Sequence, residues 1–272
     1  MTGSIIAAAV SMGVLGVLFA YGLYWASKKF AIETDERVEA VMRMLPGANC
    51  GACGYAGCAA MAEALVQGKV LPNACGPNGP AGAAKIAEYL NIGSGDARQM
   101  VAQVACRGNE LDPRVDYIGI NDCRAAHLVV AGPKACVYGC IGLGTCVEAC
   151  RFDALTQDEL GVPIVDAEKC TGCGACADVC PRGVIKMVPV GDTFFVRCNS
   201  TIDVRTKRTL CKTGCIGCRI CERTCEYDAV HVTDGLARID PDKCTGCGEC
   251  AAKCPTKCIE PQGSVYEVRS AG

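Results

Sequence analysis

Cysteines dominate the residues that could carry chemistry in this sequence. The 272 residues include 25 cysteines, and most of these stand two or three residues apart in tight runs. Neighbours at that spacing converge on a common centre more readily than they form disulfides, which need a defined separation of two side chains. Soft thiolates in such runs select iron–sulfur clusters, zinc or Cu(I). We therefore predict thiolate metal sites in a reducing compartment rather than a disulfide scaffold.

Two of the runs have the C-x2-C-x2-C-x3-C-P spacing of bacterial ferredoxins. In that pattern three cysteines bind one [4Fe-4S] cluster and the fourth binds a second cluster. Each run therefore needs a partner block upstream, and each has one, an arrangement that zinc would not explain. The runs are Cys170, Cys173, Cys176, Cys180 and Cys244, Cys247, Cys250, Cys254, and the partner blocks are Cys136, Cys140, Cys146, Cys150 and Cys215, Cys218, Cys221, Cys225.

Each run and its partner block form one copy of an internal duplication. The segment ACVYGCIGLGTCVEACRFDAL (residues 135–155) aligns without a gap with LCKTGCIGCRICERTCEYDAV (residues 210–230). Leu143 stands where the second copy has Cys218, so the first copy must use its other three upstream cysteines. In the second copy, Cys211 would replace Cys218 if the repeat dictated ligation. We favour Cys218, because C-x2-C-x2-C is the compact loop that wraps one corner of a cluster.

Crossed ligation between the runs and their partner blocks gives four [4Fe-4S] clusters. A further block lies upstream and can close a fifth four-cysteine site, where interspersed glycines would let backbone amides approach the inorganic sulfides. Structural zinc is the alternative for this block, because four cysteines alone do not discriminate between the two. The five predicted ligand sets are Cys136/Cys140/Cys146/Cys180, Cys170/Cys173/Cys176/Cys150, Cys215/Cys218/Cys221/Cys254, Cys244/Cys247/Cys250/Cys225 and Cys50/Cys53/Cys58/Cys75.

Five cysteines remain outside these sets, and we expect them to be thiols that pack as small apolar side chains. Two of them, Cys106 and Cys198, each end a short β-like stretch ahead of a repeat and could occupy equivalent places in the duplicated structure. A sixth cluster would require the two repeats to face each other. Its candidate ligands are Cys106, Cys123, Cys198 and Cys211, which leaves Cys258 as a thiol.

The N-terminal stretch predicts a membrane-spanning helix that would hold these sites at a membrane. Residues 4–25 carry no charge and suffice to cross a hydrocarbon core of about 30 Å at about 1.5 Å per helical residue. Lys28 and Lys29 follow at once and predict that the C-terminal side is cytoplasmic. A cleaved signal peptide is the alternative, but the stretch lacks a basic start and exceeds the usual apolar length.

The expected fold is α+β and made of small modules, because aromatic residues, at 5%, are too few for one large conventional core. Thiolate clusters can stabilise domains that burial alone would not. Short strands, such as GVIKMVPV and AVHVT, surround the cysteine blocks, and AAKIAEYLN predicts a helix. We predict a transmembrane helix (1–27), a small helical [4Fe-4S] domain (33–92), two tandem ferredoxin modules (93–190, with its core at 135–190, and 191–262) and a tail (263–272).

Other function classes are not indicated. The net charge of −2 gives no reason to expect nucleic-acid binding, which depends on basic surfaces that release counterions. The glycine-rich segments GLGTC and GYAGC are loops between cysteines, so we expect neither NAD nor flavin to bind to this chain. The sequence shows no constellation of a hydrolytic nucleophile, and we predict no catalytic residue.

The order of these parts resembles the B subunit of the Rnf (Rsx) complex over essentially the whole chain. LPGANCGACGYAGCAAMAEAL (residues 45–65) resembles the family's signature, and CTGCGECAAKCPTKCIE (residues 244–260) resembles its C-terminal ferredoxin half. The additional unit at 135–181 resembles the longer members found in anaerobes. Arg151 and Glu226 depart from the pattern, since ferredoxins usually have proline there.

The resemblance implies a non-catalytic electron-carrier subunit of an ion-translocating ferredoxin:NAD+ oxidoreductase. It implies soluble ferredoxin as the donor, and integral-membrane and flavin-carrying subunits of the same complex as partners. The protein would cross the bacterial inner membrane once, with its soluble part in the cytoplasm. The alternatives are a polyferredoxin subunit of another membrane complex, such as a hydrogenase, and a zinc-binding structural module.

Overall fold

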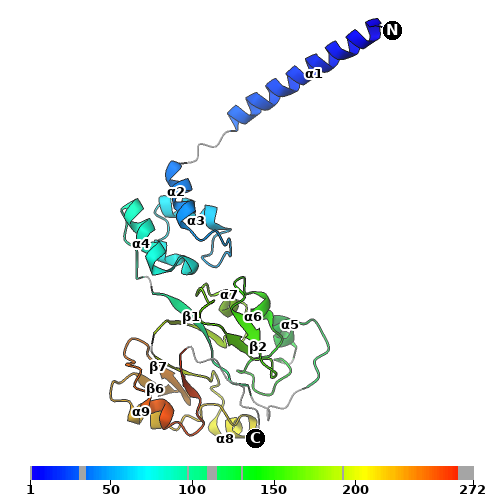
Figure 1. Ribbon diagram of the computed structural model, residues 1–272. Helices are drawn as coiled ribbons and strands as arrows, with labels where there is room; N and C mark the ends of the chain where they lie inside the picture. Colours follow the sequence, from blue (N-terminus) through cyan, green and yellow to red (C-terminus); the bar gives the residue numbers. More distant parts are fainter. Residues whose placement is uncertain are drawn as a thin grey trace. The chain divides into compact units, whose positions relative to one another are not determined.

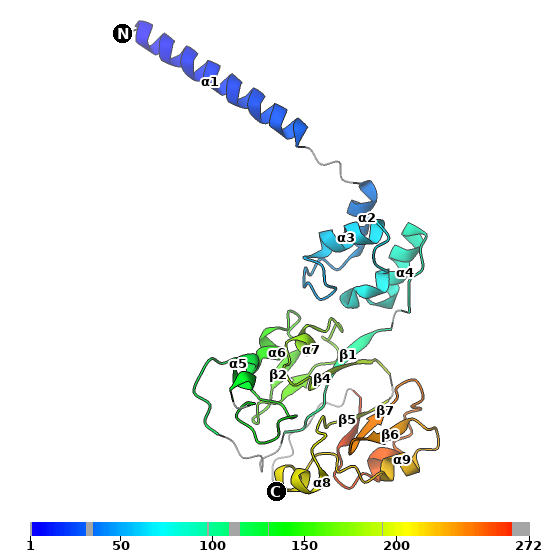
Figure 2. The same ribbon diagram turned by 180° about the vertical axis from the view of Figure 1, so that it is seen from behind.

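The computed structural model describes residues 2–30, 35–96, 98–108, 115–129, 131–191 and 193–262. The chain divides into two compact units, residues 1–40 and residues 41–272, and Figures 1 and 2 show its elements from two sides. The predicted tail, residues 263–272, lies outside the described residues, as do the first two residues of the predicted helical domain.

The first unit consists mainly of one long helix, α1 (Thr2–Lys29). Its part Val10–Lys29 is long and apolar enough to cross a membrane. Large apolar side chains along it are exposed within the unit, such as Met12 and Phe19, and a continuous apolar surface of this kind marks an interaction with a membrane or a protein. Length and composition therefore agree with the predicted span.

The N-terminal part of the second unit, residues 41–96, is helical and is called the helical domain below. Its buried apolar side chains include Val41, Met61, Leu65 and Ile86. The prediction of a helix from AAKIAEYLN is confirmed. The elements are α2 (Glu36–Met44), which begins in the first unit, α3 (Cys58–Val66), α4 (Gly79–Leu90), and two short 3₁₀ turns between the last two, η1 (Pro72–Ala74) and η2 (Gly76–Asn78).

Two modules of the same architecture follow. In the first module (residues 98–191), the opening strand β1 (Met100–Val104) pairs antiparallel with the closing strand β4 (Ile185–Pro189), and a hairpin of β2 (Leu155–Gln157) and β3 (Pro163–Val165) lies between them in sequence. The helices of this module are α5 (Cys123–Leu128), α6 (Thr145–Glu148) and α7 (Ala175–Asp178).

The second module (residues 193–262) repeats this pattern. Its opening strand β5 (Phe194–Val196) pairs antiparallel with its closing strand β8 (Ile259–Pro261), and β6 (Val230–Thr233) forms a hairpin with β7 (Leu236–Ile239). Its helices are α8 (Val204–Leu210), α9 (Ile220–Thr224) and α10 (Glu249–Ala252). The short strands predicted around the cysteine blocks are therefore present in both modules.

The hairpin of each module explains how two distant cysteine blocks meet. The partner block precedes the hairpin, the ferredoxin-like run follows it, and the turn reverses the chain between them. As a result α6 packs against α7 in the first module, and α9 packs against α10 in the second. Each of these short helices follows the first cysteines of its block, so the two blocks face each other.

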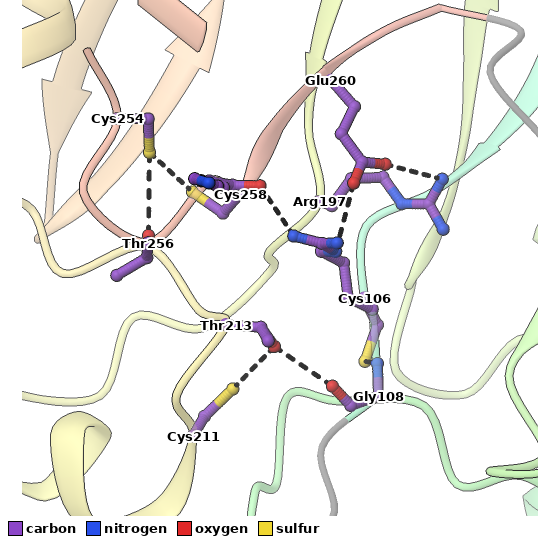
Figure 3. Close-up of polar contacts among 11 residues, drawn as sticks. Cys106, Gly108, Arg197, Cys211, Thr213, Cys254, Thr256, Cys258 and Glu260 are labelled. Atoms are coloured by element: carbon purple, nitrogen blue, oxygen red, sulfur yellow. Dashed lines mark hydrogen bonds and ion pairs between the residues drawn. The ribbon is translucent and has the colours of Figure 1, made fainter. Parts of the chain in front are cut away.

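The two modules face each other through a half-buried ion pair between Arg107 and Glu260, which Arg197 of the second module also contacts, and through a hydrogen bond. Arg107 Nε lies 3.1 Å from Glu260 Oε1, and Arg197 Nη1 lies 3.6 Å from Glu260 Oε2 (Figure 3). The Thr213 hydroxyl donates to the carbonyl oxygen of Gly108 at 3.1 Å. Because Arg107 and Gly108 belong to the first module and Glu260 and Thr213 to the second, these contacts hold the modules against each other.

Candidate iron–sulfur centres

The four thiols predicted for the helical domain come together around Cys75. Burial raises the pKa of Cys75 to about 11, and the other three thiols of its set lie within electrostatic reach and raise it further. The backbone N–H of Cys58 donates to Asn49 Oδ1 at 2.8 Å, which fixes the loop at the start of α3. A Cβ on Gly57 would lie 2.9 Å from the same oxygen, so a larger residue there would displace the Asn49 side chain from this contact. The set is Cys50, Cys53, Cys58 and Cys75.

This first site adjoins the ferredoxin-like run of the first module. A Cβ on Gly76, which follows Cys75, would lie 2.8 Å from the carbonyl oxygen of Gly172 and 3.4 Å from Cα of Cys173. The Cys50 thiol is also within electrostatic reach of Cys173. Two of the predicted ligand sets are therefore direct neighbours.

The second site of the chain joins the first run to the last cysteine of its partner block. Burial raises the pKa of Cys176 to about 12, and the thiols of Cys170, Cys173 and Cys150 lie within electrostatic reach of it. The backbone N–H of Ala154 donates to Cys150 Sγ at 3.4 Å, as amides near iron–sulfur ligands do. The structure thus brings together all four cysteines of the predicted crossed set.

At the other site of the first module, three of the four predicted ligands line one cavity together with a cysteine from outside the set. A cavity with about 410 Å³ of empty space, part of it open to solvent, is lined by Cys140, Cys146, Cys180 and Cys123. Cys136, the fourth predicted ligand, is not among its lining residues. It lines a neighbouring space between the modules.

Local contacts explain why Cys123 enters this cavity. It begins α5, where the Asp122 carboxylate caps the helix by accepting from the N–H groups of the next turn, as favoured N-caps do. The Cys123 N–H donates to Thr145 Oγ1 at 2.7 Å and ties α5 to the partner block. Leu143, which replaces the cysteine of the second copy, packs against the buried group that contains Cys123. The missing cysteine at position 143 was the signal in the sequence for a ligand from elsewhere.

The corresponding site of the second module agrees with the predicted set. A cavity with about 320 Å³ of empty space, partly open to solvent, is lined by Cys215, Cys218, Cys221 and Cys254, and not by Cys211. The backbone N–H of Ala237 donates to Cys215 Sγ at 3.4 Å. The compact loop with Cys218 is therefore the one that faces the cavity.

The last predicted set also comes together. Burial raises the pKa of Cys250 to about 11, and Cys244, Cys247 and Cys225 lie within electrostatic reach of it. Cys250 is buried whereas Cys247 is exposed. This site therefore reaches the protein surface at the Cys247 loop.

The thiols of two predicted sites line cavities of several hundred cubic ångströms. No two of the 25 cysteines, all of which lie in the described part of the chain, form a disulfide. Among the described residues, no three Cys, His, Asp or Glu side chains are grouped closely enough to hold one metal ion, as structural zinc requires. In a [4Fe-4S] cluster each thiolate binds a different iron atom, so the sulfur atoms stand further apart around a larger centre.

Comparison with known proteins agrees with this chemistry. Family models match residues 45–77 (an Fe-S cluster family), 163–186 (4Fe-4S binding domain) and 214–258 (4Fe-4S dicluster domain). The B subunit of the Na(+)-translocating ferredoxin:NAD(+) oxidoreductase complex of Acetobacterium woodii is 42% identical over 91% of this chain and 75% of its own length. The B subunit of the ion-translocating oxidoreductase complex of Methanosarcina acetivorans is 39% identical over 92% and 97%. The chain belongs to this family of B subunits.

A third member of the family, from Clostridium ljungdahlii, is the B subunit of a proton-translocating ferredoxin:NAD(+) oxidoreductase complex and is 41% identical over 92% of this chain and 90% of its own length. Membership confirms the resemblance to the Rnf subunit and the prediction of [4Fe-4S] electron transfer. The zinc module and the hydrogenase polyferredoxin are not favoured. Eight cysteines of the chain lie outside the three matched segments: Cys106, Cys123, Cys136, Cys140, Cys146, Cys150, Cys198 and Cys211.

In this member of the family, the Cys258 thiol lies within hydrogen-bond reach of two predicted ligands, Cys254 and Cys215, and its single proton serves one of them at a time. Its side chain is only 1% exposed, and its Sγ lies 3.7 Å from Cys254 Sγ (Figure 3). The hydrogen bond from Cys258 lowers the pKa of Cys254 to about 5, and a second one lowers the pKa of Cys215 to about 6. The contacts with these two sulfurs raise the pKa of Cys258 itself. The thiol therefore favours negative charge on the two ligand sulfurs.

We expect the substitution Cys258→Ala to lower the midpoint potential of the cluster at this site without changing the iron content. A donor to a ligand sulfur stabilises the reduced cluster, which carries the greater negative charge, so its loss favours the oxidised form. The measurement is a potentiometric titration followed by EPR. Cys258→Ser keeps a donor and is the control. Equal potentials in the wild-type protein and Cys258→Ala would contradict this role.

Proposed function

We propose that this chain is a non-catalytic electron carrier of an ion-translocating ferredoxin:NAD+ oxidoreductase. It accepts electrons from reduced ferredoxin and delivers them to membrane partner subunits. The proposal rests on one observation above all: the four-cysteine sites adjoin one another from the helical domain into the first module, and the two modules face each other. A bound [4Fe-4S] cluster supplies one-electron chemistry at each such site.

The residues of the chain hold these sites and determine where electrons enter the protein and where they leave it. Backbone N–H groups donate to several of the ligand sulfurs, as at Cys150 and Cys215. At the second module the exposed Cys247 offers the closest approach for a soluble donor. The helical domain follows the membrane helix in sequence, so we assign its site to the exit toward the membrane.

We further propose that α1 is a single span of the bacterial inner membrane, with the modules in the cytoplasm. Lys28 and Lys29 lie in the last turn of α1, and cationic residues at one end of a span hold that end in the cytoplasm. Apart from the neighbouring backbone of α1 itself, no described heavy atom lies within 4 Å of a Cβ built on Gly13 or Gly16. Small residues of this kind allow close packing against helices of integral-membrane subunits. Flavin-carrying subunits of the complex would receive the electrons next.

One experiment tests the donor and the orientation together. Reduced ferredoxin added to inverted membrane vesicles, whose cytoplasmic face is outside, should bleach the visible absorption of the clusters rapidly. Right-side-out vesicles should show no bleaching until they are opened with detergent, because the donor cannot cross the bilayer. A variant without residues 1–30 should be reduced equally fast in solution. Bleaching in intact right-side-out vesicles would reverse the orientation, and no bleaching of the opened protein would exclude ferredoxin as the donor.

A further inference from the structure

A cysteine-lined space lies between the two modules, apart from the five sets described above. It contains about 600 Å³ of empty space, part of it open to solvent. Five cysteines line it. Cys140 is shared with the neighbouring site of the first module, and the other four come from four separate segments, two from each module. They are Cys106 and Cys136 of the first module and Cys198 and Cys211 of the second.

The internal duplication relates these four cysteines in pairs. Cys136 and Cys211 occupy the same position of the aligned repeats. Cys106 and Cys198 each stand two residues after the opening strand of their module, β1 and β5 respectively. Cys106 and Cys198 therefore occupy equivalent positions in the two modules, as expected from the sequence. Each module contributes the same two positions, so the space has an approximate two-fold arrangement of thiols.

Backbone hydrogen bonds follow the same symmetry. In the first module, the N–H groups of Gly108 and Cys140 donate to Cys106 Sγ at 3.4 and 3.5 Å. In the second module, the N–H groups of Ser200 and Cys215 donate to the Cys198 thiol. Both donors stand at equivalent positions in the two modules. Amide donors to sulfur are typical of cluster ligands, and their repetition indicates a shared role.

A glycine lies close to the sulfur atom in each of the loops that carry Cys136 and Cys211. A Cβ on Gly139 would lie 3.4 Å from Cys136 Sγ. A Cβ on Gly214, at the same position of the second repeat, would lie 3.3 Å from Cys211 Sγ and 3.5 Å from Cys198 Sγ. Two of the four sulfur atoms therefore lie close to one common point. The interface contacts shown in Figure 3 keep the Cys106 and Cys211 segments side by side.

The same space is lined by basic side chains, which suits an anionic group. Lys134, Arg197 and Lys207 are all buried, with Lys207 only 2% exposed. Within the described part of the chain, the ammonium group of Lys207 contacts the carbonyl oxygens of Ser200 and Gly235 and no carboxylate. Buried charges are costly unless an opposite charge compensates them. A [4Fe-4S] cluster with four thiolate ligands carries negative charge and would supply it.

We propose that Cys106, Cys136, Cys198 and Cys211 bind a sixth [4Fe-4S] cluster at the interface of the two modules. Cys123 then takes the place of Cys136 at the neighbouring site of the first module. The sixth cluster would stand between two other sites, since Cys140 also lines this space and the Cys215 N–H donates to Cys198. It would connect the electron path of the first module with that of the second.

This assignment rests on the [4Fe-4S] chemistry of the proposed function but not on the donor or the direction of electron flow. Native mass spectrometry of the anaerobically purified full-length protein should count six clusters per chain. Chemical analysis should find about 24 iron and 24 sulfide, at four of each per cluster. Five clusters and about 20 iron would overturn the assignment, whatever the rate of reduction by ferredoxin. A failure of that reduction with six clusters present would affect only the proposed function.

Double variants identify the ligands. The pair Cys198→Ala/Cys211→Ala should lose about four iron atoms, and adding Cys136→Ala should remove no more. Adding Cys146→Ala to that pair should remove about four further iron atoms, because Cys146 belongs to another site. Cys258→Ala, a buried cysteine outside every set, is the matched control and should keep all its iron. Additive losses for Cys136→Ala and Cys198→Ala would place Cys136 back in the first module's own site.

Discussion

A variant with Cys53→Ser and Cys58→Ser should stop electron delivery to the membrane partners while the two modules remain reducible by ferredoxin. The two cysteines belong to the site of the helical domain, and Gly76 packs this site against the Cys173 loop of the first module. If electrons enter at the modules, removal of this site breaks the path only at its end. The loss should be about four iron atoms per chain.

The measurement has two parts. Bleaching of the module clusters by reduced ferredoxin should proceed at nearly the normal rate, and NAD+ reduction by membranes should fall to near background. Ala56→Ser/Ala59→Ser is the matched control, since it adds two serines at exposed positions of the same segment without removing a thiol. If the cysteine variant instead lost its reduction by ferredoxin but still delivered electrons from other donors, the helical domain would be the entry point.

The second large effect is expected from Cys123. Cys123→Ala should lose the cluster of the site that Cys140, Cys146 and Cys180 line, about four iron atoms. Leu143→Cys should restore it, because position 143 corresponds to Cys218 and would complete a C-x2-C-x2-C loop like that of the second module. Leu143 already packs against the group that contains Cys123, so the new thiol would lie near the lost one.

Iron and sulfide analysis with EPR of the reduced protein measures this rescue. Leu143→Cys alone should leave the cluster count unchanged, and it is the control for the added thiol. Leu143→Cys should not rescue Cys136→Ala, because Cys136 lines a different space. Full iron content in Cys123→Ala would show that the set expected from the sequence, with Cys136, is the correct one.

The sequence alone predicts the sites whose ligands come from short loops. In a ferredoxin-like run three cysteines lie two residues apart, so the local backbone alone brings them to one centre. The known pattern of such runs also predicts that the fourth cysteine of each block binds the cluster of the other block. In agreement with this, the structure places Cys150 near Cys176. A helix long and apolar enough to cross a membrane could also be predicted, because this property depends only on length and apolar composition.

Ligands from distant segments could not be assigned in this way. Cys123 is separated from the partner block by a loop, and only α5 and its hydrogen bond to Thr145 place it in the cavity. The sequence raised a sixth cluster but with Cys123 in place of Cys136, because an alignment of repeats does not reveal which way a thiol faces. The direction in which these thiols face depends on the docking of the two modules through Arg107 and Glu260. A site between the modules forms only after both modules have folded and packed against each other.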